Sequence, residues 1–419
     1  MNRPPSSVVT TFLFAAVLTL TLATSAMATQ YAVIYRFHGA PDGQYPTGDL
    51  VADPAGNLYG TTSAGGSNGL GSVYQLTPPT SGKLWAETVL YSFATGGDGT
   101  NPVAGLVRDA AGNLYGTTFI GGQGFAGTVF ELSPPSSAGG AWTEKVLYSF
   151  TGFADGSRPQ CKLLLAKNGA LMGTTFSGGA HSAGTVFKLT PPSVPGGAWV
   201  ESILYSFTGR GDGAFPWPGV VADKAGNLYG VNEANGVNSY GTAFELSPPV
   251  GGVGAWQETI LHSFGLFEGA NPVGELVLDQ AGNVYGMTNV GPGSVSCGTV
   301  FQLVPPASKG GAWTENILYT FTCGNDGGDP YSGLVFDSAG DLLGADAYQG
   351  SYGGGAIFKL SPSAGAWTET TLHDFAGGPD GMESYSTLIR GKGGAYFGAT
   401  VTGGGGTNSS FGTIFELKP

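Results

Sequence analysis

A phrase close to Val-Leu-Tyr-Ser-Phe recurs at an almost fixed interval along the chain, and this repeat constrains the fold more than any other feature. Successive copies of its final phenylalanine are separated by 56, 57, 57, 57, 57 and 54 residues. The seven copies end at Phe37, Phe93, Phe150, Phe207, Phe264, Phe321 and Phe375. A fixed period of this length indicates an architecture built from repeated supersecondary units.

Each repeat contains four segments with strand character. In the second repeat they cover residues 105–109, 114–118, 127–132 and 142–150. The segments are rich in β-branched and aromatic residues and are bounded by Gly, Pro, Asn and Asp, which is typical of short strands. The Asp-x-x-Gly-Asn turn at residues 109–113 suits a tight hairpin, because Gly and Asn tolerate positive φ. Four antiparallel strands per unit predict the blade of a β-propeller. An open β-solenoid or a string of separate sheets is the alternative.

The two ends of the mature chain favour a closed ring. Residues 31–37 match a fourth strand and residues 412–417 match a third strand, so the ends are two parts of one blade. Pairing them would remove two exposed sheet edges. The inner-strand markers, one per repeat, are Leu50, Leu106, Leu164, Val220, Leu276, Leu334 and Leu388. The sequence therefore predicts an all-β, seven-bladed β-propeller with four antiparallel strands per blade and a last blade closed by the N-terminal strand.

The first 28 residues have the features of a secretory signal peptide. Arg3 precedes an apolar stretch at residues 8–22, and Ala26-Met27-Ala28 forms a peptidase site before Thr29. No later segment approaches the length of a membrane span, and no anchor segment is visible. We expect residues 29–419 to form a single exported propeller domain of seven repeats of about 57 residues, secreted outside the cell or into a periplasm.

The composition excludes some partners. The chain has a formal net charge of −13 and only 11% charged residues, which makes it a poor partner for nucleic acid. Its 75 glycines do not indicate disorder, because 12% of the residues are aromatic and can be buried. We expect a monomer.

The repeated phrases Tyr-Gly-Thr-Thr, Gly-Thr-Val-Phe-Glu-Leu and Leu-Tyr-Ser-Phe, at this period, resemble the GloVer tandem-repeat family over essentially the whole mature chain. The resemblance implies an exported bacterial protein with a repeat fold. Members of that family carry different C-terminal surface anchors. The resemblance implies no reaction.

A ligand site is expected where residues interrupt the repeat at the top of the inner strand. The loop that follows the fourth strand and the variable loop between strands two and three should share one face, where recognition usually occurs. The position before each marker holds Asp49, Gly105, Leu163, Gly219, Glu275, Gly333 and Thr387. Lys162, Trp217, Tyr331 and Tyr385 lie nearby in the sequence.

These positions suggest a site at the mouth of the central channel. Aromatic rings beside carboxylates can stack on a sugar and hydrogen-bond its hydroxyls. The alternative is that these side chains fill space between unequal blades. The predicted ligand-binding residues are Asp49, Lys162, Trp217, Glu275, Tyr331 and Tyr385.

Acidic residues recur in the loops after the fourth strands, mostly in the sequence Asp-Gly. They are Asp42, Asp98, Asp155, Asp212, Asp326 and Asp380, with Glu268 in the remaining blade. They form either a ring for calcium or a cationic ligand, or local Asx turns in which each carboxylate accepts backbone N–H groups of its own loop. We favour the Asx turns.

The sequence predicts no metal, no cofactor and no catalytic residue. The four histidines and three cysteines show no metal-ligand spacing, and no hydrolase elbow or phosphate-binding loop is present. His262 and His373 replace the tyrosine of the repeat and are expected to be satisfied within a blade. Cys297 directly precedes a third strand and Cys323 follows the adjacent fourth strand, so antiparallel pairing and export predict a disulfide between them.

Three hypotheses of function remain open. The first is a non-catalytic module that binds an extracellular glycan or protein through the variable-loop face. The second is an extracellular glycan-active enzyme with Asp49 or Glu275 as acid or base, assisted by Lys162. The third is a purely structural cell-surface protein.

Overall fold

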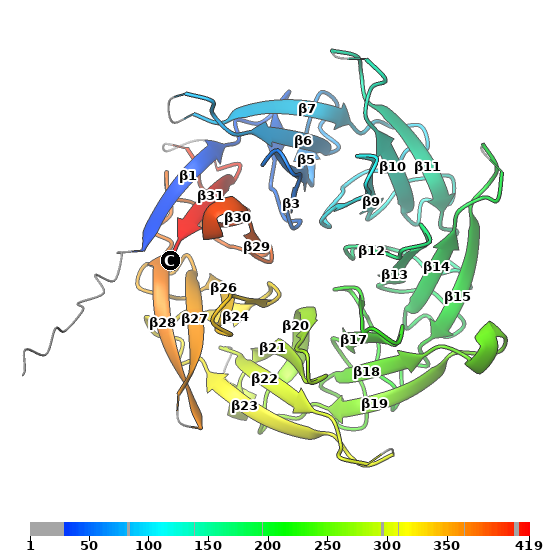
Figure 1. Cartoon of the computed structure of the whole chain (residues 1–419), viewed down its shortest axis with the longest axis vertical. Coiled ribbons are helices and arrows are strands. Elements are labelled where there is room, and N and C mark those ends of the chain that lie inside the picture. The colour runs from blue at the N-terminus through cyan, green and yellow to red at the C-terminus, as the bar shows by residue number, and fades with distance from the viewer. Residues whose placement is uncertain are drawn as a thin grey trace, which may run out of the picture.

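Seven β-sheets surround a central channel in the computed structural model (Figure 1). The structure describes residues 29–81, 84–137, 139–194, 196–294, 297–308, 310–363, 365–405 and 410–419. The predicted signal peptide, residues 1–28, lies outside this part of the chain. The predicted all-β, seven-bladed propeller is confirmed, with four antiparallel strands in each blade.

In blades 1 to 6 the strands run from the channel outward in chain order. Blade 1 contains β3 (Val51–Ala52), β4 (Leu58–Thr62), β6 (Ser72–Thr77) and β7 (Ala86–Ser92). Blade 2 contains β8 (Val107–Arg108), β9 (Leu114–Thr118), β10 (Thr128–Ser133) and β11 (Thr143–Ser149). Blade 3 contains β12 (Leu164–Leu165), β13 (Leu171–Thr175), β14 (Thr185–Thr190) and β15 (Val200–Ser206). Blade 4 contains β16 (Val221–Ala222), β17 (Leu228–Asn232), β18 (Thr242–Ser247) and β19 (Gln257–Ser263).

The remaining blades follow the same plan with small additions. Blade 5 contains β20 (Ala270–Leu278), β21 (Val284–Val290), β22 (Thr299–Val304) and β23 (Thr314–Thr320). Blade 6 contains β25 (Val335–Phe336), β26 (Leu342–Tyr348), β27 (Ala356–Ser363) and β28 (Ala366–Asp374), and β24 (Gly328–Pro330) also pairs with β26. Blade 7 contains β29 (Ile389–Arg390), β30 (Tyr396–Thr400), β31 (Thr413–Lys418) and β1 (Gln30–Arg36). The described residues also contain three short 3-10 turns: η1 (Val250–Gly252), η2 (Pro292–Ser294) and η3 (Lys392–Gly394).

The N-terminal strand closes the ring, as the sequence predicts. β1 pairs antiparallel with β31, and its residues run from Gln30 opposite Lys418 to Arg36 opposite Thr413. The first and last strands therefore share one sheet, and no blade is left with an open third strand. Figure 1 shows β1 lying along the outside of β31.

Aromatic side chains fill the space between neighbouring blades. Phe93, which follows the outer strand of blade 1, contacts Phe130 on β10 of blade 2 with ring centroids 5.2 Å apart. Both rings are fully buried. A Cβ at Gly116, on β9 beneath Phe130, would lie 2.6 Å from that ring, so the glycine of Tyr-Gly-Thr-Thr is required by the phenylalanine of the next strand.

The two kinds of loop expected to share one face do pair with each other. In blade 1 they form the short strands β2 (Gly43–Gln44) and β5 (Ala64–Gly65). Equivalent single bridges join Thr100 to Ile120 and Ala214 to Ala234. This loop face surrounds one end of the channel.

A three-residue arrangement recurs where neighbouring blades meet. The Tyr91 hydroxyl donates a hydrogen bond to Asp98 Oδ2 at 2.8 Å, and the Ala94 backbone N–H donates to the same oxygen at 3.0 Å. Burial and then the Asp98 charge raise the pKa of Glu144, on the outer strand of blade 2, to about 7. The same trio recurs as Tyr35–Asp42–Glu87, Tyr148–Asp155–Glu201, Tyr205–Asp212–Glu258 and Tyr319–Asp326–Glu369.

The predicted Asx-type role of the six loop aspartates is confirmed. Each accepts a hydrogen bond from the backbone N–H four residues earlier in its own loop, at 2.7–3.0 Å. The expectation that His262 and His373 are satisfied within their own blades is wrong. The His373 ring stacks on Tyr31 of blade 7, with centroids 3.5 Å apart, and His262 lies 3.5 Å from Glu315 of blade 5. Position in the repeat places both rings between blades.

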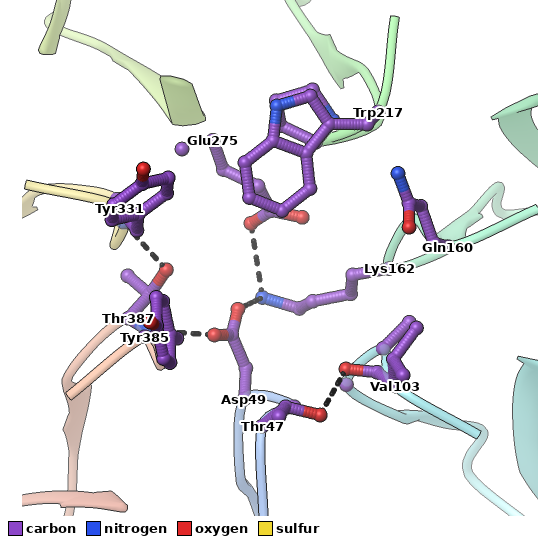
Figure 2. Close-up of a pocket in the computed structure, with 16 residues that line it drawn as sticks. Thr47, Asp49, Val103, Gln160, Lys162, Trp217, Glu275, Tyr331, Tyr385 and Thr387 are labelled. Atoms are coloured by element: carbon purple, nitrogen blue, oxygen red, sulfur yellow. Dashed lines mark hydrogen bonds and ion pairs between the residues drawn. The ribbon is translucent and has the colours of Figure 1, made fainter. Parts of the chain in front are cut away.

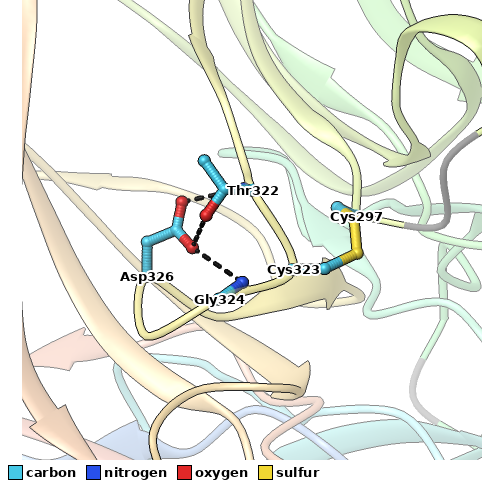
Figure 3. The surroundings of a disulfide bond; sticks show 5 residues. All are labelled: Cys297, Thr322, Cys323, Gly324 and Asp326. Carbon is cyan, nitrogen blue, oxygen red and sulfur yellow. Dashed lines mark hydrogen bonds between the residues drawn. A yellow bond between two sulfur atoms is a disulfide. The ribbon is translucent and has the colours of Figure 1, made fainter.

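A disulfide joins Cys297, directly before β22, to Cys323, just after β23, with a Cα–Cα distance of 5.2 Å (Figure 3). Cys161 is free and fully buried, and burial raises the pKa of its thiol to about 11, which makes it unreactive at neutral pH. Among the residues with described structure, no helix has the length and hydrophobicity needed to cross a membrane.

Candidate functional site

The strand register shows that Lys162 occupies the same position in the third repeat that Asp49 occupies in the first. Leu164 pairs with Met172 as Val51 pairs with Tyr59, so Leu164 corresponds to Val51. The inner-strand marker of blade 3 is therefore Leu163, which is 2% exposed, and the prediction of Leu164 is wrong by one residue. Because residues 163–165 are all leucine, the sequence does not show which of them is the marker.

The corrected register reveals a layer of residues around the channel, one from each blade. Charged or polar side chains alternate with glycines in this inner layer, which consists of Asp49, Gly105, Lys162, Gly219, Glu275, Gly333 and Thr387. A Cβ at Gly105 would lie 2.7 Å from the Cβ of Asp49, so a side chain at Gly105 would collide with this neighbour. All members except Gly219 line a small cavity of about 60 Å³.

Lys162 connects the two carboxylates of the inner layer across the channel (Figure 2). Its Nζ lies 3.2 Å from Asp49 Oδ2 and 3.1 Å from Glu275 Oε2. The Thr387 backbone N–H donates to Asp49 Oδ1 at 2.6 Å. The side chains of Asp49 and Glu275 are 11% and 19% exposed, and that of Lys162 is 27% exposed. The three groups form a largely desolvated charge cluster, which we call the channel cluster.

Burial and charge act in opposite directions on this cluster. Burial alone lowers the pKa of Lys162, but the neighbouring carboxylates of Glu275 and Asp49 outweigh it and hold that pKa above the ordinary value. Burial raises the pKa of Glu275 against the lowering effect of Lys162, and Asp49 adds to the increase. Lys162 is therefore protonated at neutral pH, and Glu275 is the member most ready to accept a proton.

A second layer lies three residues before each marker and forms the channel mouth. Six members of this outer layer line an adjoining pocket of about 360 Å³: Thr47, Val103, Gln160, Trp217, Tyr331 and Tyr385. The ring centroids of Trp217 and Tyr331 are 6.5 Å apart, and those of Tyr331 and Tyr385 are 5.2 Å apart. The Trp217 indole N–H has no hydrogen-bond partner among the described residues. Figure 2 shows these rings around the channel cluster.

All six residues predicted to bind a ligand line the same cavity. Trp217, Tyr331 and Tyr385 come from blades 4, 6 and 7, so the site is assembled from separate repeats. Sequence reasoning missed Thr47, Val103 and Gln160. Their common position three residues before the marker was the signal that could have found them.

The arrangement provides aromatic faces above a paired charge cluster. Both carboxylates are bonded to the same ammonium group, and the Tyr348 and Tyr385 hydroxyls bond each other at 2.6 Å. Chemically, the pocket offers stacking surfaces and hydrogen-bonding groups to a polar ligand.

Comparisons with known proteins support the fold and the repeat. A sequence model described as the Gloeobacter/Verrucomicrobia repeat matches residues 15–217 and 137–311. No curated protein sequence matches significantly. The extracellular domain of a protein described as a one-component system from B. thetaiotaomicron is similar with a TM-score of 0.53 and 12% identity, over 93% of this chain and 42% of that one. An ulvan lyase is similar with a TM-score of 0.50 and 12% identity, over 92% of this chain and 95% of that one. At these identities the likeness shows the propeller fold alone.

Proposed function

We propose that this chain, which belongs to the Gloeobacter/Verrucomicrobia repeat family, is an exported β-propeller that binds an uncharged extracellular glycan at the channel mouth without transforming it. The observation that carries the proposal is the arc of Trp217, Tyr331 and Tyr385 above the channel cluster. Aromatic side chains combine a large apolar face with a polar edge, which suits a sugar ring with its hydroxyls. The outer pocket of about 360 Å³ falls within the usual range for small-molecule sites.

The charge of the site favours a neutral ligand. Two carboxylates and one ammonium group leave the channel cluster with one net negative charge when all three are ionised. The whole chain has a formal charge of −13. An anionic polysaccharide would meet repulsion both at long range and in the pocket.

The pairing of the carboxylates argues against glycoside hydrolysis. That reaction requires one carboxylic acid and one carboxylate acting as nucleophile or base. Here Asp49 and Glu275 are both bonded to Lys162, and the raised pKa of Lys162 prevents it from acting as a base at neutral pH. One observation still favours the hypothesis of a glycan-active enzyme, namely the raised pKa of the Glu275 carboxyl group.

A protein ligand is the second candidate, favoured by apolar side chains at the tips of the loop face. Phe125, Phe153, Val237 and Phe267 are 78–87% exposed. Exposed apolar groups of this kind can mark an interaction surface. A protein partner would contact the loop tips, whereas a glycan would enter the pocket.

Export of the mature domain belongs to the same proposal. It rests on the signal-like residues 1–28 and on the repeat family. Protein recovered from outside the cytoplasm should begin at Thr29, which N-terminal sequencing or intact mass would establish. A protein retained in the cytoplasm with Met1 would contradict it.

Binding is tested by thermal melting and calorimetry of residues 29–419 with neutral and anionic soluble polysaccharides. A ligand that binds only the folded state raises Tm by mass action. We expect a shift with a neutral glycan that Trp217→Ala removes and that the matched loop variant Phe125→Ala keeps. Reducing ends released by wild type but not by Glu275→Gln would establish the enzyme instead. No Tm shift with any glycan would refute the glycan proposal. If the wild-type protein captures a protein partner, loss of that binding in Phe125→Ala but not in Trp217→Ala would favour the second candidate.

A further inference from the structure

The junction between blades 4 and 5 departs from the repeated Tyr–Asp–Glu trio at two positions. His262, on β19, stands where the other blades have tyrosine, and Glu268 stands where they have aspartate. The third position keeps its glutamate, Glu315 on β23. The loop is also one residue shorter, because His262 and Glu268 are six residues apart in place of the seven between Tyr205 and Asp212. The side-chain changes and the shortened loop occur together and alter the whole junction.

The changes remove the hydrogen bonds that the tyrosine and the aspartate of the regular trio make. In the neighbouring junction the Tyr205 hydroxyl donates to Asp212 Oδ2 at 3.2 Å, and the Thr208 N–H donates to the same oxygen at 2.7 Å. Glu268 accepts no backbone N–H from the residues that the structure describes. His262 Nε2 is buried and also lacks a hydrogen-bond partner there. Glu315 Oε1 lacks one as well, as does the equivalent Oε1 atom of the regular junctions, for example that of Glu258. Three polar side chains thus converge without satisfying one another.

Their atoms have the spacing of ligands to one ion. His262 Nε2 lies 3.4 Å from Glu268 Oε1 and 3.5 Å from Glu315 Oε2. All three ligand atoms lie within 4.8 Å of one another. Two atoms that bind one tetrahedral zinc ion, each at about 2.0–2.2 Å, are separated by roughly 3.3–3.6 Å. The two His262 distances fall in that range.

We propose that His262, Glu268 and Glu315 bind a divalent transition-metal ion of the zinc type between blades 4 and 5. One imidazole nitrogen and two carboxylate oxygens are a ligand set that such ions accept, and imidazole suits Zn²⁺ better than Ca²⁺ or Mg²⁺. The Glu268 side chain is 35% exposed, so an ion can enter from solvent and keep water in a remaining position. The Glu315 side chain, 11% exposed, fixes the inner side of the site.

The second histidine junction lacks one of the three ligands. His373 Nε2 lies 3.1 Å from Asp380 Oδ2, but the third position holds Tyr31, whose ring stacks on the imidazole. That junction satisfies its groups by hydrogen bonding and stacking, and it offers only one carboxylate. It therefore provides a control within the same chain.

The bound ion would link two neighbouring blades. It would connect the outer strand of blade 4, the loop that leads into blade 5 and the outer strand of blade 5. Because the unfolded chain does not hold these three residues together, binding would stabilise the folded state. Glycan binding at the channel mouth uses none of these residues, so the two proposals stand independently.

Zinc binding to tag-free residues 29–419, stripped with EDTA and dialysed, tests the proposal by calorimetry. We expect one Zn²⁺ per chain, a rise in Tm with Zn²⁺, and visible absorption bands on Co²⁺ substitution. His262→Tyr restores the residue of the other blades, and Glu315→Gln keeps the shape of the side chain, so both should fold. Each should weaken Zn²⁺ binding at least tenfold.

The matched controls separate this site from general surface binding. His373→Tyr changes the other histidine junction, and Glu258→Gln changes the equivalent glutamate of the regular junction before this one. Both should bind Zn²⁺ as wild type does. Absence of Zn²⁺ binding by wild type, or undiminished binding by folded His262→Tyr and Glu315→Gln, would overturn the proposal.

Discussion

Replacing Lys162 with methionine should destabilise the propeller in a pH-dependent way. The change keeps most of the aliphatic side chain and removes the ammonium group that lies 3.2 Å from Asp49 and 3.1 Å from Glu275. Two carboxylates, 11% and 19% exposed, would then face each other across the channel without a counter-charge. The variant therefore isolates the electrostatic contribution of the channel cluster.

The magnitude follows from the burial of the cluster. Removing one partner of a buried ion pair costs about 3–5 kcal/mol. The Lys162 side chain is 27% exposed to the channel, and solvent screening places the cost at the lower end, about 3 kcal/mol near pH 8. At about 2.1 cal/mol/K per residue, a chain of this length loses roughly 1.2 °C of Tm for each kcal/mol, so about 3 kcal/mol should lower Tm by roughly 4 °C.

The sign of the pH dependence comes from Glu275. Its pKa is already raised in the folded protein, and loss of Lys162 raises it further, so the folded variant holds a proton that the unfolded chain releases. Stability of the variant is therefore greatest below the unfolded pKa and falls as pH rises through the folded one. The cost of the substitution should be small near pH 5 and large near pH 8.

Thermal melts of wild type and Lys162→Met at both pH values measure this difference. Lys145→Met, at an exposed position, is the matched control and should melt as wild type does. The triple variant Lys162→Met/Asp49→Asn/Glu275→Gln removes all three charges and should recover most of the loss. A Lys162→Met variant with wild-type stability at pH 8, or with a loss that does not change with pH, would refute the reasoning.

Three further predictions concern the scaffold. Burial and a neighbouring aspartate raise the pKa values of four junction glutamates, Glu87, Glu144, Glu201 and Glu258, to about 7. The stability that these groups contribute should therefore be greatest below pH 4.5 and disappear as pH rises through 7. Urea midpoints at pH 5 and 8 should show this decline, and replacing all four glutamates with glutamine should reduce it. Mass spectrometry of oxidised protein should find Cys297 linked to Cys323, and the double serine variant should lose about 3–4 kcal/mol for a separation of 26 residues; alkylation of both thiols in oxidised protein would contradict this. Deleting residues 29–36 removes β1 and exposes β31, so size-exclusion chromatography should show aggregation; a monomer with wild-type Tm would contradict the closure.

The fold could be predicted because the same packing contacts recur between blades, so the same residue types recur in every repeat. Each blade needs a phenylalanine at the end of its outer strand. All seven second strands have a glycine at the same position, namely Gly60, Gly116, Gly173, Gly230, Gly286, Gly344 and Gly398. The phase of the two ends then identified the closing strand. The register failed only in the third blade, where Leu163, Leu164 and Leu165 carry the same hydrophobicity and Ala166 replaces the aspartate of the turn.

The candidate sites were predictable to different degrees for a physical reason. The channel residues lie at two fixed positions of each repeat, so alignment of the repeats collects them even though Asp49 and Glu275 are far apart in the chain. The proposed metal ligands lie at three different positions of the repeat and belong to two blades. His262 and Glu268 share one loop, but Glu315 lies 47 residues further along the chain on the outer strand of the next blade, so packing of neighbouring blades brings the three side chains together.

The alternation in the inner layer explains how a seven-fold scaffold can hold an asymmetric polar site. Seven full side chains at this radius would collide, as the 2.7 Å approach of a Cβ at Gly105 to Asp49 indicates. Glycine in every second blade leaves room for Asp49, Lys162 and Glu275 to reach one another. Because seven is odd, the alternation must fail once, and it fails between Thr387 and Asp49. There the Thr387 backbone N–H donates to the Asp49 carboxylate at 2.6 Å, so the forced mismatch also orients one member of the cluster. The alternation of large and small residues therefore provides the space for the polar site, and the one mismatch of the odd-numbered ring supplies a backbone donor to it.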